Sequence, residues 1–420
     1  MKILLQSPRI VNTRSPFHGK KKNVLLVNGR IAEIGDKNFQ ADKIIDAEGM
    51  FLSAGWFDLG TFVGDPGLEH REDLVSVARA AAAGGFTEIA LLPNTQPAIQ
   101  TKNEISYVTR HNDSRLVQLH ALAVVTKNGK GEELTDMIDL HEAGAVAFTD
   151  GLKPLWHTDI FLKSLQYLQK FNGLLIDHPE DIWLDLFGQM HEGAQSAMLG
   201  LKGMPGIAEE ITVSRNLKLL EYAGGRLHFA RISSAQSVNL IRAAKKKGLN
   251  VSCDVTSFQP LLLDNALRGF DTNYKTNPPL RSEADAAALL KGLGDGTIDV
   301  LCSGHLPVDD ESKFLEFDHA EFGMINLQTF AAQLVELSAE IKVEELILKV
   351  AEAPRTLLQR DVPIIDIDEK ANLTLFDPNA EWTFAPASNF SKSRNSPWLN
   401  QKLKGKAVAV FNNGRSKMED

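Results

Sequence analysis

The sequence predicts an α/β protein built as a (β/α)8 TIM-like barrel, with a small β-sandwich domain assembled from both ends of the chain. Between about residues 55 and 340, short apolar runs alternate with longer amphipathic stretches. Mostly apolar strands that alternate with helices indicate a parallel sheet buried on both faces. The expected barrel strands are residues 56–59, 88–92, 119–125, 145–149, 174–177, 226–232, 249–255 and 298–302.

Four of the stretches between these strands end in glycine directly after their last apolar turn. They are residues 72–85, 131–144, 234–248 and 282–296. Glycine is common at this position because a helix often ends in the left-handed conformation that glycine adopts most easily. We therefore expect a helix after the first, third, sixth and seventh strands.

Both ends of the chain are rich in short β-prone runs, whereas the middle is not. The runs 24–27 and 31–34 flank Asn28-Gly29, which is a typical hairpin turn. We expect the two ends to pack together as one sandwich. The predicted domains are residues 1–54 with 365–420 for the sandwich, and residues 55–364 for the barrel.

Charge and composition exclude several classes of protein. The formal net charge is -9, and acidic and basic residues are mixed along the chain, so nucleic-acid binding is not expected. No apolar run has the roughly 18–20 residues that a membrane span needs. Cys253 and Cys302 lie in apolar runs and are expected to be buried free thiols. A cytoplasmic protein follows as the expectation.

In a barrel of this kind, functional side chains lie at the C-terminal ends of the strands. A zinc site needs three or four His, Cys, Asp or Glu ligands. Asp150, His178, His228 and His305 are the candidates near strand ends, and no His-x-His sequence occurs. Each has a structural alternative: Asp150 precedes a glycine in a turn, and a histidine within an apolar strand, such as His228, is more often a hydrogen-bonded core residue.

Other catalytic patterns are missing from the sequence. No Gly-x-Ser-x-Gly turn indicates an α/β-hydrolase, and no phosphate-binding glycine loop follows a strand. The residues alone therefore predict a barrel whose mouth is polar but poor in metal ligands.

Several runs nevertheless resemble type I dihydroorotases of the amidohydrolase superfamily. They are AGWFDLGTFVGDPGLEHREDLVSVARAAAAGGFTEIALLPNTQP, IDHPED, GQMHEGAQSAMLGLKGMPGIAEE, DTNYKTNPPLR, GLGDGTIDVLCSGHLP, ANLTLFDPNAEWTF and SKSRNSPWLNQKLKGKAVAVFNNGR. The resemblance covers nearly the whole chain. It implies an amidohydrolase-type barrel that uses zinc to interconvert carbamoyl aspartate and dihydroorotate in pyrimidine biosynthesis.

The resemblance also implies that most catalytic positions carry other residues here. The metal-binding His-x-His falls on Gly60 and Phe62, and a further histidine ligand falls on Arg231. The aspartate that serves as ligand and general base falls on Gly304. An arginine that holds the substrate carboxylate falls on Gly64, and a substrate-contacting histidine falls on Val308.

Some positions of the family are kept. Asp150 and His178 match two metal ligands, and Asn94, Asn277 and His305 match substrate-binding residues. No residue is assigned a catalytic role. We expect Arg231 to pair with Asp150 or another carboxylate, and we expect Phe62 to fill space that a metal would occupy.

These assignments favour a dihydroorotase-like protein of pyrimidine biosynthesis that is catalytically inactive, holds no metal or other cofactor, and has a structural or regulatory role. An active zinc-dependent dihydroorotase with an altered site is the first alternative. Binding of a small anion, or a changed activity in the old pocket, is the second. The resemblance suggests aspartate transcarbamoylase or an active dihydroorotase as a partner, and a homodimer as the oligomeric state.

Overall fold

The computed structural model describes residues 1–110, 112 and 115–418, and its centre is an eight-stranded parallel sheet. The strands are β7 Trp56–Thr61, β8 Phe86–Leu91, β9 Gln118–Ala123, β10 Ala147–Phe148, β11 Leu175–Asp177, β14 Leu227–Phe229, β15 Val251–Thr256 and β16 Val300–Cys302. They follow one another around the sheet in chain order, and the two edge strands β16 and β7 are in contact. Each overlaps one expected strand, so the predicted barrel is confirmed.

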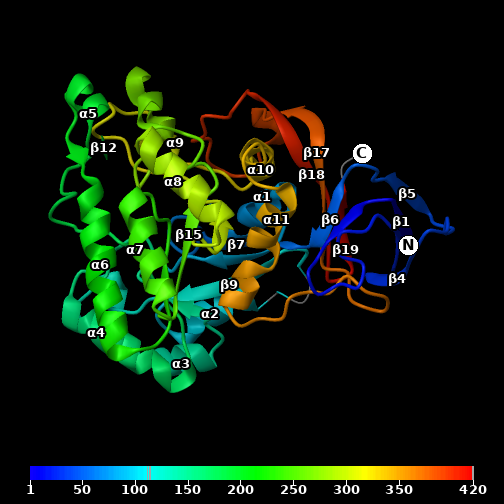
Figure 1. Cartoon of the computed structure of the whole chain (residues 1–420), viewed down its shortest axis with the longest axis horizontal. Coiled ribbons are helices and arrows are strands. Elements are labelled where there is room, and N and C mark those ends of the chain that lie inside the picture. The colour runs from blue at the N-terminus through cyan, green and yellow to red at the C-terminus, as the bar shows by residue number, and fades with distance from the viewer. Residues whose placement is uncertain (111, 113–114, 419–420) are drawn as a thin grey trace.

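Helices connect the strands and cover the outside of the barrel, which forms the left part of Figure 1. They are α1 Leu74–Gly84, α2 Lys102–Thr109, α3 Met137–Glu142, α4 Thr158–Leu168, α5 Ala194–Leu199, α6 Gly206–Ala223, α7 Ala235–Lys246, α8 Glu283–Gly294, α9 Asp310–Lys313, α10 Phe330–Leu337, α11 Val343–Ala351 and α12 Ala353–Leu357. In the long segment after β11, the short strands β12 Met190–His191 and β13 Gly203–Met204 pair with each other.

Helices α1, α3, α7 and α8 occupy the four stretches predicted to be helical. The residues on either side of helix α1 determine where this helix begins and ends. The Asp73 carboxylate accepts hydrogen bonds from the N–H groups of Val75 and Ser76, which otherwise lack partners in the first turn. Gly85 ends the helix with a φ of 99°, a left-handed conformation that favours glycine.

Strands from both ends of the chain build two further sheets, on the right in Figure 1. One has the order β4-β3-β1-β5 and the other the order β19-β18-β17-β6-β2. The strands are β1 Lys2–Gln6, β2 Arg9–Val11, β3 Asn23–Val27, β4 Arg30–Gly35, β5 Lys43–Asp46, β6 Phe51–Ala54, β17 Leu373–Thr383, β18 Lys402–Asn412 and β19 Arg415–Met418. Apolar side chains of both sheets share one core, which includes Leu5, Leu26, Leu52, Leu375 and Phe411.

The predicted hairpin at Asn28-Gly29 joins β3 to β4, and both turn residues have positive φ, as this turn requires. Strand β17 pairs with β6, so the two ends of the chain are hydrogen-bonded to each other. The boundaries of the predicted domains, after residues 54 and 364, stay a prediction.

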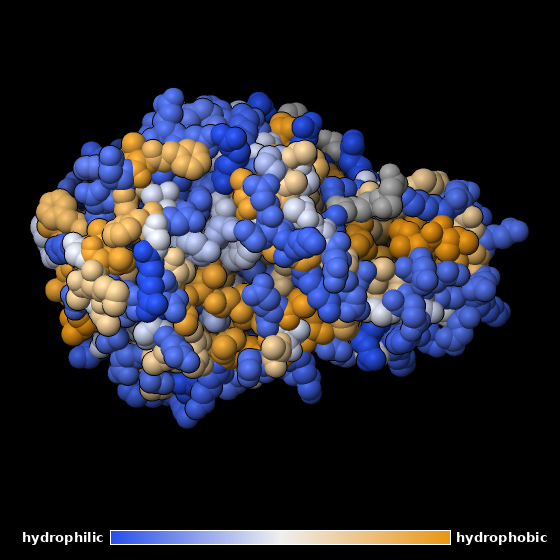
Figure 2. Space-filling model, turned by 90° about the horizontal axis from the view of Figure 1, so that it is seen from above, coloured by the Kyte–Doolittle hydropathy of each residue, from blue (hydrophilic) through white to orange (hydrophobic). Residues whose placement is uncertain are grey.

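The two cysteines are buried and unpaired, as predicted. None of the described helices combines the length and the apolar character needed to cross a membrane. Seen from above, hydrophilic side chains cover most of the surface, and apolar side chains gather in small patches over both the wide barrel and the narrower sheet region (Figure 2).

Candidate functional site at the barrel mouth

Arg231 lies just beyond the C-terminal end of β14, with only 6% of its surface exposed. The Asp254 carboxylate fixes its backbone by accepting a 2.6 Å hydrogen bond from its N–H group. Its guanidinium Nη2 donates a 2.7 Å hydrogen bond to the carbonyl oxygen of Gly60, at the end of β7. Within the described residues Arg231 makes no ion pair, so the expected pairing with Asp150 or another carboxylate is wrong.

The space left at this mouth is small. The cavity has a volume of about 20 Å³, and one water molecule needs roughly 10–15 Å³. Leu59, Leu92, Leu122 and Ile176 line it from inside the barrel, together with His178, Arg231 and Asp254. Phe62 is 4% exposed and packs in the apolar cluster that fills this end of the barrel. The cavity therefore has room for about one water molecule.

The three glycines Gly60, Gly64 and Gly304 differ in the space around them and in backbone conformation. Gly304 has a φ of 65°, and a Cβ atom there would lie 2.6 Å from Cγ2 of Thr256. Gly60 has a φ of 85°, which also favours glycine. At Gly64, a Cβ atom would lie 2.2 Å from the carbonyl oxygen of Leu68. A side chain at position 64 would require Leu68 to shift, and one at position 304 would require Thr256 to shift.

Asp150 is buried, and backbone groups occupy its carboxylate. It accepts 2.9 Å hydrogen bonds from the N–H groups of Val125 and Thr126, and a further bond from the Thr126 hydroxyl. Burial raises the pKa of Asp150 to about 6, against the effect of these hydrogen bonds. Asn94 binds the same turn: its amide donates to the Asp150 carbonyl and accepts from the Leu152 N–H, both at 3.0 Å. Asp150 and Asn94 therefore hold the β9 and β10 loops together.

His178 and Asn277 meet at a second carboxylate. The Nε2 atom of His178 lies 3.4 Å from Oε2 of Glu180, and the Asn277 amide donates to the same oxygen at 3.0 Å. Burial raises the pKa of Glu180, but the hydrogen bonds and charge around it, first among them those of His178, outweigh burial and leave the pKa lowered. These three residues form a cluster separate from the hydrogen bonds of Asp150.

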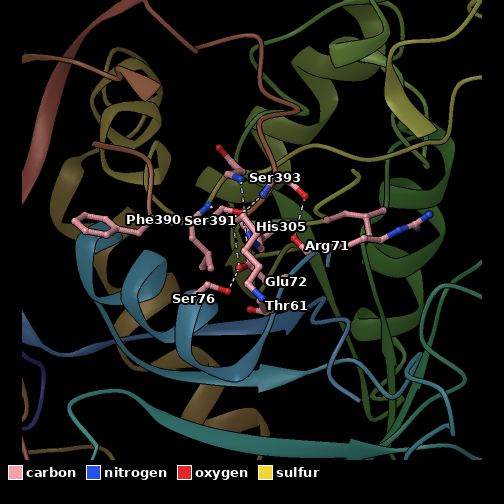
Figure 3. A network of polar contacts seen from close by, with 12 residues as sticks. Thr61, Arg71, Glu72, Ser76, His305, Phe390, Ser391 and Ser393 are labelled. Atoms are coloured by element: carbon pink, nitrogen blue, oxygen red, sulfur yellow. Dashed lines mark hydrogen bonds and ion pairs between the residues drawn. The ribbon is translucent and has the colours of Figure 1, made fainter. Parts of the chain in front are cut away.

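His305 belongs to a third cluster, which extends toward the C-terminal segment (Figure 3). Its Nδ1 atom accepts a 3.1 Å hydrogen bond from the N–H of Asn326, so the proton of a neutral ring lies on Nε2. Nε2 lies 3.4 Å from Oε2 of Glu72. Glu72 also accepts hydrogen bonds from the hydroxyls of Ser76 and Ser391. The family position at His305 thus serves a buried network that links β16, α1 and the chain near Ser391.

His228 has the role expected of a core histidine. It is fully buried, and its two ring nitrogens lie 2.8 Å from Ser252 Oγ and 2.9 Å from Asp254 Oδ2. Asp254 therefore positions both His228 and Arg231.

The residues at the mouth do not fit a zinc centre. Gly60, Phe62 and Gly304, at family positions of metal ligands, have side chains without a ligand atom. The guanidinium of Arg231 does not lose its proton to bind a cation. In the part of the chain that the structure describes, no group of three or more His, Cys, Asp or Glu residues could hold a metal ion. Asp150 and His178, the two remaining candidates, belong to different hydrogen-bonded clusters.

The nearly closed barrel of eight parallel strands, with two added sheets, defines a class of protein, the amidohydrolase-type barrel. Among solved structures, it is similar to the L-hydantoinase of Arthrobacter aurescens, with a TM-score of 0.85 and 21% identity over 99% of this chain and 96% of that one. It is also similar to the dihydropyrimidinase of Brevibacillus agri, with a TM-score of 0.81 and 20% identity over 100% of this chain and 95% of that one. At this identity the likeness concerns the fold.

Sequence relatives identify the family within this class. The Dihydro-orotase-like family model matches residues 49–237. A dihydroorotase of Pelotomaculum thermopropionicum is 39% identical over 100% of this chain and 99% of its own length, and one of Citrifermentans bemidjiense is 37% identical over 99% of both. The chain belongs to the dihydroorotase-like family.

Three acidic residues that organise the site were assigned no role from the sequence. Asp58 accepts 2.6 Å hydrogen bonds from both the N–H and the hydroxyl of Ser303, and so joins the ends of β7 and β16. Glu209 accepts from the N–H groups of Ser233 and Ser234 in the turn that follows Arg231. Together with Glu72, these carboxylates bind groups in other elements of the fold, which local sequence patterns do not indicate.

Proposed function

We propose that this chain is a dihydroorotase-like protein that does not catalyse the dihydroorotase reaction and holds no zinc. Its role would then be structural or regulatory, within pyrimidine biosynthesis. The observation that carries the proposal is the Arg231 guanidinium, which fills the barrel mouth and donates to the carbonyl oxygen of Gly60.

A fixed positive charge at this position opposes a cation. Each unit of positive charge about 5 Å away costs roughly 3 kcal/mol at an effective dielectric near 20. The remaining side chains cannot offset this, because the Asp150 carboxylate already accepts from Val125 and Thr126. The positive charge of Arg231 and the shortage of free ligand atoms therefore both argue against a bound metal.

The chain also carries no side chain at the family position of the general base. The family position of that group is Gly304, where a side chain would meet Thr256. Loss of a general base commonly lowers a rate by about two to four decades. Without a metal, the Lewis acid and the activated water of the family's reaction are lost as well.

The first alternative is an active, zinc-dependent dihydroorotase, which is what the names of the relatives describe. It would require Arg231 to leave the mouth and new ligands to join His178. The second alternative is a small anion bound beside Arg231. The lack of an ion-pair partner for Arg231 among the described residues favours it, whereas the cavity volume of about 20 Å³ opposes it.

The test is an assay of dihydroorotate hydrolysis and carbamoyl aspartate cyclisation, with and without excess zinc, beside a genuine dihydroorotase. We expect no turnover in either direction and less than one tenth of an equivalent of zinc after dialysis. Zinc-dependent turnover by the wild-type chain would overturn the proposal. Protection against thermal unfolding by carbamoyl aspartate, lost in Arg231→Met, would favour the anion alternative.

A structural role makes a separate prediction about partners. We propose aspartate transcarbamoylase or an active dihydroorotase as the partner, and a homodimer in its absence. Light scattering during size-exclusion chromatography gives the mass of the chain alone and of its mixture with each purified enzyme from the same organism. A mass that stays at that of one chain in every mixture would contradict both expectations.

A further inference from the structure

A groove on the outer surface has the volume that the barrel mouth lacks. It measures about 570 Å³, within the range of roughly 300–1,000 Å³ typical of small-molecule sites. Leu74, Val75, Ala78 and Ala82 from α1 form one side. Leu116 and Val117, just before β9, and Phe390 complete an apolar lining.

Among the described residues, the charged side chains that line this groove are all basic. Arg79, Arg115, Arg415 and Lys417 line it, and none of the described acidic residues does. Within the part of the chain that the structure describes, the side chains of Arg79 and Arg415 form no hydrogen bond or ion pair, and both residues are exposed. A chain with a net charge of -9 thus presents four cations around one apolar surface.

The wall at Phe390 is fixed by the chain around it. The Phe390 N–H donates a 2.7 Å hydrogen bond to the side-chain oxygen of Gln328, and the ammonium of Lys417 lies 5.8 Å from the centre of the ring. The next two residues, Ser391 and Lys392, bind Glu72 and Asp73 at the start of α1. Figure 3 shows the Phe390 ring pointing away from this network, toward the outside of α1. The segment that carries Phe390 is therefore held against α1 by hydrogen bonds and an ion pair before any ligand binds, which lowers the entropy cost of binding.

From this geometry we infer that the groove between α1 and Phe390 binds a small amphiphilic anion, with an apolar chain against α1 and a carboxylate-like head among the arginines. The apolar lining provides the area for the chain, and the unpaired guanidinium groups provide donors for an anionic head. The site is independent of the catalytic state of the barrel, because its lining residues include none of the barrel-mouth residues.

Decanoate tests the inference, with its neutral analogue decanol for comparison. Calorimetric titration of the wild-type chain is expected to give saturable decanoate binding, with decanol at least about tenfold weaker, which corresponds to one or two charge-assisted contacts. Raising the salt concentration should weaken the binding of decanoate but not of decanol, because salt screens exposed charges.

Variants separate the two halves of the site. Arg79→Gln with Arg415→Gln should weaken decanoate binding at least about fivefold and leave decanol unchanged, whereas Phe390→Ala should weaken both ligands. Arg268→Gln is the matched control, since Arg268 is exposed and lies outside the groove. Circular dichroism verifies that each variant is folded.

Three results would overturn the inference. The first is no saturable decanoate binding by the wild-type chain at millimolar concentration. The second is equal decanoate affinity in the wild type and the double arginine variant. The third is a change of oligomeric state in that variant, measured by light scattering, because it would assign the groove to a second copy of the chain.

Discussion

Two buried arginines lie at opposite ends of the barrel and have different partners. Arg355 is fully buried near the start of β7 and β8, where it forms a 2.7 Å ion pair with Glu88 and donates to the Gly55 carbonyl. Arg231, at the mouth, donates to one carbonyl group and makes no ion pair within the described residues. The guanidinium at the base has a carboxylate partner, whereas among the described residues the guanidinium at the mouth has none.

The difference indicates which end of the barrel is built for stability. At the base, Glu88 also binds His120 at 2.8 Å and Asn372 at 3.1 Å, so this carboxylate joins the barrel to the segment before β17. Burial alone would raise the pKa of Glu88, but the charges of Arg355 and His120 and their hydrogen bonds leave it lowered. Arg231 has no such function, and its removal leaves no carboxylate without a partner.

The largest expected change in the free energy of unfolding concerns Arg355, at the end of the barrel opposite the mouth. Arg355→Met should lower the free energy of unfolding by about 5 kcal/mol, because it leaves the buried Glu88 carboxylate without its cation. Urea unfolding followed by circular dichroism measures the loss. Arg360→Met serves as the control, since Arg360 is exposed. A loss below about 1 kcal/mol would mean that the ion pair does not compensate Glu88.

Removal of apolar contacts at the mouth comes next. Phe62→Ala should cost about 3–5 kcal/mol, as is usual for truncation of a buried aromatic side chain. The same unfolding measurement applies, with the exposed Phe270→Ala as its control. If Phe62→Ala costs no more than its control, the ring does not fill the mouth, and the comparison between the two ends fails.

Asp150 makes the stability depend on pH. Burial raises its pKa in the folded state to about 6, well above the ordinary value of an aspartate side chain, so the folded state binds the proton more tightly. Stability from this group is present at low pH and is lost as pH rises through 6. Relative to Asp150→Asn, the wild type should therefore gain about 2 kcal/mol between pH 7 and pH 4. Parallel pH profiles for the two proteins would contradict this.

The smallest effect is expected for the arginine at the mouth. Arg231→Met should change the free energy of unfolding by about 1 kcal/mol or less, since replacement of a buried charge by an apolar side chain of similar length is often neutral or stabilising. Unfolding curves at neutral pH test this. A loss above about 3 kcal/mol would show that the Arg231 charge has a partner after all, and would remove the contrast with Arg355.

The sequence predicts the barrel well because the signals for its elements are local. Apolar runs mark the buried strands, and a glycine such as Gly85 marks a helix end through its own backbone conformation. Asn28 and Gly29 predict their turn for the same reason. None of these signals depends on which distant residue is in contact.

The site depends on contacts that local patterns do not encode. The sequence shows that positions 60 and 304 carry no ligand atom, but it does not show where the Arg231 side chain points. The prediction of a carboxylate partner failed because the Asp150 oxygens are already occupied by the β9 loop. Only the fold reveals this competition among hydrogen-bond donors.

The hydrogen bonds between the two ends of the chain have a consequence for synthesis on the ribosome. The N–H of Trp56, at the start of the first barrel strand, donates to Thr374, which is 318 residues further along. At roughly 5–20 residues per second, the ribosome needs about 15 to 65 seconds to supply that partner. During this interval β6, which pairs with β17, has an unpaired edge, and a chaperone that covers it would favour correct folding of the nascent chain.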